Sequence, residues 1–79
     1  MKKGTEKKIV ARIQKIADKL RKMRIEKGFT SYEHFAWDNE IGRQQYWRIE
    51  KGRNFTMQTL LKILDIHKIT LEEFFKGMD

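Results

Sequence analysis

Two short helical segments separated by a tight turn constrain the fold of this chain more than any other feature. In the first segment Thr30 is followed three residues later by Glu33, which is the spacing of a capping box. We therefore expect a short helix that begins at Ser31 and runs to about Asp38. Asn39 is expected to end this helix, because Asn tolerates a left-handed backbone better than any residue except Gly.

The second helix of the pair begins at Gly42, with Ile41 as the apolar pivot before it. Gly52 is its expected end, since Gly suits the left-handed backbone that often follows a helix. At about 100° per residue, one face of this helix is apolar and the opposite face is polar. The polar face carries Gln44, Trp47, Arg48 and Lys51, flanked by Arg43 and Gln45. Amides, cations and an indole are suited to base edges and phosphates, so this face predicts contact with DNA.

Helical periodicity recurs in the rest of the chain, whereas strand-like alternation never persists, so we predict an all-α protein with five helices. A long first helix is expected between a cap at Thr5 and a stop at Gly28. Thr56 is expected to cap a fourth helix that ends near Ile66, and residues 70–73 form a capping box that opens the last helix. The predicted core consists of Ile16, Leu20, Phe29, Phe35, Ala36, Ile41, Tyr46, Ile49, Leu60, Leu61, Leu64, Ile69, Leu71 and Phe74.

The net charge of +7 is distributed unevenly along the chain. Residues 1–28 carry eight Lys and three Arg against three acidic residues, a net charge of +8, whereas residues 29–56 balance and residues 57–79 come to −1. Most of the basic charge therefore lies on the first helix and not on the second helix of the pair. Two interpretations stay open: a solubilising surface, or a field that attracts phosphates and speeds encounter with DNA.

Several kinds of chemistry lack the residues that they need. The chain has no Cys, which removes disulfides, thiolate metal sites and thiol catalysis and fits a reducing cytosol. His34 and His67 are far apart and have no companion ligands at metal spacing, so we expect no metal and no cofactor. Ser31 is the only serine and has no positioned base, so we expect no enzymatic activity. No segment approaches the roughly 18 apolar residues of a membrane span, and we expect a soluble cytoplasmic protein without a small-molecule ligand or a membrane partner.

Four segments together resemble the Cro/repressor type of helix-turn-helix, also called XRE-like, a family of phage repressors and small bacterial regulators. The segments are LRKMRIEKGFTSYEHFA, IGRQQYWRIEKG, MQTLLKIL and ITLEEFF, and the resemblance covers residues 16–75. It implies a compact five-helix bundle of the lambda-repressor-like DNA-binding type, with the helix-turn-helix formed by helices 2 and 3. Residues 1–15 are then a basic N-terminal extension that continues into helix 1, and residues 16–79 are the helix-turn-helix domain.

The resemblance also implies which side chains meet the DNA. Base contacts in the major groove fall to Arg43, Gln44, Trp47 and Arg48. Phosphate contacts that set the register fall to Ser31, Tyr32, Arg53 and Asn54, to which we add the flanking Gln45 and Lys51. Two alternatives stand for Trp47: contact with a thymine methyl or sugar, or a position at the edge of the core.

The family pattern also pairs Arg24, near the end of helix 1, with Glu50, near the end of helix 3. Glu50 directly follows an apolar residue, so it would lie at the margin of the core, where a lone carboxylate disfavours folding. Glu40 and Lys68 depart from the pattern, since relatives usually have Gly there, and a left-handed backbone would cost about 1 kcal/mol at each. Gly42 stands where relatives usually have the hydroxyl cap of helix 3. This replacement should cost only about a few tenths of a kcal/mol.

These features predict a small transcription regulator that binds double-stranded DNA sequence-specifically, as a repressor that blocks a promoter. An antitoxin-type autoregulator of a toxin pair is an alternative within the same DNA-binding class. A different class is a protein-interaction module in which the basic first helix binds an acidic partner, without sequence-specific DNA binding. A basic helix lying on an anionic membrane is a third class, although the apolar face of that helix is needed for the core.

A homodimer is expected, because 79 residues are near the lower limit for an independent core and such regulators contact two half-sites about 34 Å apart. The dimer contact is assigned either to the N-terminal extension or to the last helix. In the extension, Ile9, Val10 and Ile13 share one face. These side chains either cover Phe74 and Phe75 and complete the monomer or form a seam with the second subunit.

Overall fold

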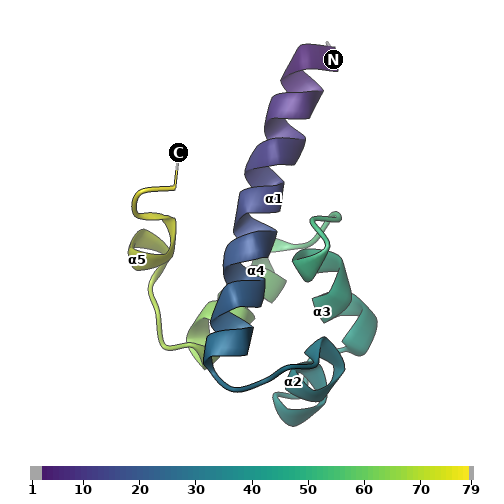
Figure 1. Ribbon diagram of the computed structural model, residues 1–79, viewed down its shortest axis with the longest axis vertical. Helices are drawn as coiled ribbons and strands as arrows, with labels where there is room; N and C mark the ends of the chain where they lie inside the picture. Colours follow the sequence, from purple (N-terminus) through teal and green to yellow (C-terminus); the bar gives the residue numbers. More distant parts are fainter. Residues whose placement is uncertain (1–2, 79) are drawn as a thin grey trace.

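Five helices and no strand make up residues 3–78, the part of the chain that the computed structural model describes. In chain order they are α1 (Lys3–Glu26), α2 (Tyr32–Asp38), α3 (Arg43–Glu50), α4 (Met57–Ile66) and α5 (Leu71–Phe75). The predicted all-α class is confirmed. Figure 1 shows α1 as a long rod with α2 and α3 on one side of it and α5 on the other. Within residues 3–78 no helix is both long enough and apolar enough to cross a membrane.

The start of α2 is set by a hydroxyl group that accepts hydrogen bonds from free backbone N–H groups. Ser31 Oγ accepts from the N–H of Glu33 at 3.2 Å and from the N–H of His34 at 3.3 Å. The predicted capping box of Thr30 with Glu33 is therefore wrong, because the cap lies one residue later and Ser31 supplies the acceptor. The predicted cap at Thr5 is also wrong, since Thr5 lies inside α1, where the backbone is already helical.

The caps of α4 and α5 form as predicted. Thr56 Oγ1 accepts from the N–H of Thr59 at 3.2 Å at the start of α4. At the start of α5, Thr70 Oγ1 accepts from the Glu73 N–H at 3.1 Å, and Glu73 Oε1 accepts from the Thr70 N–H at 3.0 Å. The backbone hydrogen bond from Thr70, followed by that from its hydroxyl, lowers the pKa of the Glu73 carboxyl group.

The first four helices end alike, with a left-handed residue just beyond the helix. Gly28 and Gly52 occupy this position after α1 and α3, with φ of 103° and 70°. Glu40 and Lys68 occupy it after α2 and α4, with φ of 56° and 55°. Both departures from the family pattern thus fall at strained backbone positions. Asn39, which was expected to be left-handed, has a φ of −105°.

The turn between α2 and α3 shows why Asn39 is not the left-handed residue. Its N–H and its side-chain Nδ2 both donate to the carbonyl oxygen of Phe35, at 3.1 and 2.9 Å, so Asn39 completes the last turn of α2. The Glu40 N–H donates to Trp37 O at 3.3 Å, and the Ile41 N–H donates to a backbone carbonyl oxygen of α2, that of Ala36, at 2.9 Å. These two bonds close a helix around a left-handed residue. The chain therefore reverses one residue later than predicted.

One apolar core joins the helices. Its buried members are Leu20, Phe35, Ala36, Ile41, Tyr46, Ile49, Leu60, Ile63, Leu64 and Phe74. Partly buried side chains that pack against it include Ile16, Phe29 and Ile69 of the predicted core. Leu61 and Leu71 were placed in the core wrongly, since they are 41% and 42% exposed. The buried positions of α4 include 60, 63 and 64, which turn Leu61 outward, and α5 buries Phe74 but not Leu71, its first residue.

The N-terminal part of α1 extends beyond the other helices (Figure 1). Ile13 is half-buried there, but Ile9 and Val10 are 38% and 61% exposed. Burial in the monomer therefore does not account for Ile9 and Val10, and the alternative in which they complete the monomer is wrong for these two residues.

Candidate nucleic-acid interface

The buried face of α3 fixes this helix to the rest of the molecule. Tyr46 and Ile49 are fully buried, and Glu50 is 8% exposed. The Tyr46 ring lies 4.9 Å from the ring of Phe35 in α2, measured between centroids. Burial, and then the neighbouring carboxylate of Glu50, raise the pKa of the Tyr46 phenol, which keeps it neutral. One side of α3 is thus held by the core, and the other side is left to solvent.

Arg24 and Glu50, which the family resemblance pairs, form a salt bridge in the interior. Arg24 Nε donates to Glu50 Oε2 at 2.7 Å and Nη2 donates to Oε1 at 3.3 Å, and the two side chains are 7% and 5% exposed. Arg24 Nη1 also donates to the carbonyl oxygen of Phe29 at 2.7 Å. The guanidinium group therefore ties the end of α1 to the end of α3 and to the connection before α2. Both carboxylate oxygens are satisfied, as a buried charge requires.

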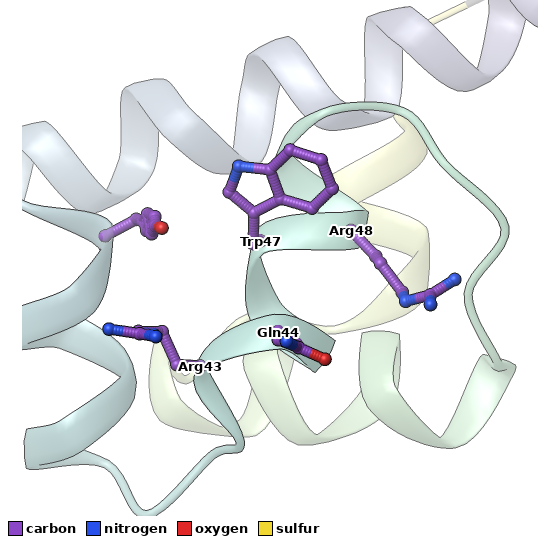
Figure 2. A pocket seen from close by; sticks show the side chains of 5 residues that line it. Arg43, Gln44, Trp47 and Arg48 are labelled. Atoms are coloured by element: carbon purple, nitrogen blue, oxygen red, sulfur yellow. The ribbon is translucent and has the colours of Figure 1, made fainter.

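The outer side of α3 carries the predicted base-contact residues. Arg43, Gln44 and Arg48 are exposed, whereas Trp47 is half-buried. Figure 2 shows these four side chains spread over one side of the helix. Together with Tyr32 from the start of α2, they line a shallow depression of about 400 Å³. The structure therefore brings Tyr32 of α2 and the four predicted base-contact residues of α3 together around one open surface.

Trp47 lies at the edge of the core and also lines the depression, and its contact with a thymine methyl or sugar stays a prediction. Its ring is half-buried, and the guanidinium carbon of Arg53 lies 5.9 Å from the ring centroid. An arginine in this position is attracted to the face of the indole ring. The contact places Arg53 beside Trp47, which lines the depression, and Lys51 and Asn54 of the same segment are exposed.

Two predicted phosphate-contact residues already have partners. Ser31 Oγ accepts the two capping bonds of α2 and keeps only its own hydrogen as a donor. Gln45 Nε2 donates to Thr59 Oγ1 at 2.9 Å, so this side chain ties α3 to α4. The sequence pattern of α3 alone did not show this contact, because Thr59 belongs to another helix.

Sequence reasoning missed two exposed residues of α2. Glu33 Oε2 accepts a hydrogen bond from Arg43 Nη1 at 3.3 Å, and the Arg43 and Glu33 side chains are 66% and 56% exposed. Trp37 is 84% exposed. Its exposure could have been found from helical periodicity, because Phe35 and Ala36 mark the buried face of α2. The pairing of Glu33 had no such signal, since its partner comes from α3.

The two histidines take part in aromatic contacts. His34 and Phe29 form a T-shaped contact, with 5.2 Å between the ring centroids and 79° between the ring planes. His67 stacks on Phe35 at 5.5 Å with an angle of 11° between the ring planes. In the described part of the chain, no three His, Cys, Asp or Glu side chains gather where they could hold a metal ion.

A family model described as a Cro/C1-type HTH DNA-binding domain matches residues 19–77, which is most of the chain. The match includes all of α2 and α3 and so covers the open surface around Gln44. No curated protein and no solved structure matches the chain. The chain belongs to the family of Cro/C1-type helix-turn-helix DNA-binding domains.

Proposed function

We propose that this protein is a small transcription regulator, acting as a repressor, that recognises a specific sequence in double-stranded DNA with α3 in the major groove. The observation that carries the proposal is the open polar edge of α3, where Arg43, Gln44 and Arg48 are exposed around one depression. The major groove of B-form DNA admits an α-helix, and each base pair presents its own pattern of donors and acceptors there. A rigid helix with exposed amide and guanidinium groups is suited to that pattern.

The side chains at the start of α3 carry the proposed specificity. Arg43 can donate two hydrogen bonds to O6 and N7 of a guanine. Gln44 can donate to N7 of an adenine and accept from its N6 amino group. Each such pair is worth about 1–3 kcal/mol of discrimination against the wrong base. Arg48 lies further along the same exposed side, and Trp47 offers an apolar contact for a thymine methyl group.

The segments beside α3 carry the proposed phosphate contacts. Lys51, Arg53 and Asn54 follow the helix and are exposed, and Ser31 and Tyr32 stand at the start of α2. Such contacts fix the register of α3 on the duplex and do not choose the sequence. Each neutralised phosphate releases counterions and steepens the plot of log K against log salt by about 0.9.

A cytoplasmic homodimer completes the proposal. Two copies related by a twofold axis would place their α3 helices in successive major grooves, about 34 Å apart. Ile9 of α1 and Leu71 and Phe75 of α5 are exposed apolar side chains that support such a contact. Bound across a promoter, the dimer would exclude the transcription machinery. Sedimentation at micromolar concentration should show the dimer, and a monomer alone would contradict it.

Selection of bound duplexes from a random pool tests sequence recognition. We expect enrichment of one motif with two related half-sites. The Gln44→Ala variant should then lose the preference for one base pair in each half-site. Its discrimination between the correct and the wrong base at that position should fall about tenfold or more. Gln58→Ala is the matched control, because Gln58 is exposed on α4 and does not line the depression.

Arg53→Ala distinguishes phosphate contacts from base contacts, because Arg53 is a proposed phosphate contact. It should weaken binding to every duplex and reduce the slope of log K against log salt by about 0.9, with the selected motif unchanged. If the unaltered protein binds all duplexes equally, sequence recognition is contradicted.

A further inference from the structure

Glu33 is an acidic side chain at the edge of a surface that, in the proposed complex, faces DNA phosphates. It belongs to the first turn of α2, and Arg43, its partner, is the first residue of α3. The hydrogen bond from Arg43 Nη1 to Glu33 Oε2, 3.3 Å long, therefore joins the two helices of the helix-turn-helix on their solvent side. A carboxylate near phosphates is repelled by them, so its presence there calls for a compensating gain.

We propose that Glu33 is a positioning residue for sequence recognition, which holds Arg43 in the conformation that recognises one base pair. This inference rests on the proposed function, because it concerns how a base-contact residue is oriented. Glu33 itself is not required to touch a base.

The geometry of the pair leaves the arginine able to bind a base. A guanidinium group has five N–H donors in a planar fork, and the contact with Glu33 uses Nη1. The donors on Nη2 and Nε are left for a guanine edge. Since a long side chain loses rotamer freedom when it binds, holding Arg43 beforehand reduces that loss at the moment of recognition.

The charge of the pair has a second effect. Glu33 offsets the positive charge of Arg43, so Arg43 attracts phosphates of arbitrary sequence less strongly. Displacement of water from the depression by DNA would lower the local dielectric constant and strengthen the attraction between the two side chains. Glu33 thereby makes Arg43 more selective: it weakens contacts of Arg43 with phosphates and leaves its contact with a base.

Glu33→Gln tests this role, because it removes the charge and keeps the size of the side chain. Both residues are more than half exposed, and Ser31 still caps α2, so the variant should fold. We expect discrimination at the base pair contacted by Arg43 to fall about three- to tenfold. We expect affinity for non-specific duplexes to rise, since one negative charge is lost.

Two comparisons make the measurement specific. Asp38→Asn removes the same charge from an exposed position of the same helix, and it should raise affinity for all duplexes without changing discrimination. In an Arg43→Ala background, Glu33→Gln should leave discrimination unchanged, because the side chain that it positions is gone.

Binding constants are measured at one salt concentration for the selected duplex and for duplexes that carry each of the other base pairs at the position that Arg43 contacts. That position is the one at which Arg43→Ala loses discrimination. If Glu33→Gln changes the affinity for all of them by the same factor as Asp38→Asn, the positioning role is overturned while the proposed function stands. If the unaltered protein shows no discrimination at any position, the proposed function fails, and this inference fails with it.

Discussion

At the scale of single residues, the carboxylate of Glu50 is 5% exposed and accepts two hydrogen bonds from Arg24. Removing one member of such a pair leaves the other charge buried without its partner, which costs about 3–5 kcal/mol. Glu50→Ala should therefore lower the thermal midpoint strongly, as followed by circular dichroism. Glu72→Ala is the control, because Glu72 is exposed and its loss should cost about 0.5 kcal/mol or less. Equal midpoints for the two variants would contradict the structural role of the pair.

His67 makes stability depend on pH. Burial, and then the positive charge of Lys27, lower the pKa of His67 below its ordinary value of 6.5. The folded protein therefore binds a proton at His67 less readily than the unfolded chain does. Above the ordinary pKa neither state is protonated and the stability is unaffected, whereas it falls as the pH drops from that value toward the lowered pKa.

Urea denaturation at pH 7.5 and pH 5.5, values about one unit on either side of the ordinary pKa, measures this effect. The unaltered protein should lose stability at the lower pH, and His67→Gln should lose less. His34→Gln should behave like the unaltered protein, because the His34 side chain is exposed. A His67→Gln variant with an unchanged pH dependence would show that another group is responsible.

At the scale of elements, the ends of α2 and α4 differ chemically from those of α1 and α3. All four place a left-handed residue after the helix, but Glu40 and Lys68 carry side chains where Gly28 and Gly52 carry none. A left-handed backbone is disfavoured for residues with a Cβ atom because that atom crowds the following carbonyl oxygen. The turns after α2 and α4 are held by their hydrogen bonds in spite of this local cost.

Lys68→Gly should relieve this strain and raise the free energy of unfolding by up to about 1 kcal/mol. The greater freedom that Gly gives the unfolded chain offsets part of the gain. Lys62→Gly, at an exposed position inside α4, should instead lower the free energy of unfolding by about 1 kcal/mol. Denaturant titration measures the free energy of unfolding of both variants. A loss of stability in Lys68→Gly would show that the left-handed Lys68 is not strained.

At the scale of the whole molecule, α3 and α5 lie on opposite sides of α1 (Figure 1). The open polar edge belongs to α3, whereas α5 exposes Leu71 and Phe75, and further exposed apolar side chains lie on α1, α2 and α4. A second copy seated on the α5 side would therefore leave the edge of α3 free. In the proposed dimer, a subunit contact through α5 would then not compete with the proposed DNA contact.

Much of the fold could be predicted because its signals are local. The apolar spacing within each helix, the cap at Thr56 and the capping box of Thr70 with Glu73 involve residues at most one turn apart. Resemblance to the family added the pair of Arg24 and Glu50, which the structure contains. The exposed side of α3 followed from periodicity, since a helix with one buried face must turn the other to solvent.

The sequence by itself thus determined the class, the order of the helices and the polar edge of α3. The tertiary structure decided which neighbours the polar side chains meet: Gln45 bonds to Thr59 of α4, and Glu33 bonds to Arg43 of α3. It also decided that Leu61 faces solvent, because only part of the apolar surface of α4 lies against other helices. The physical reason is that periodicity fixes directions within one helix, whereas contacts between helices depend on how separate helices pack.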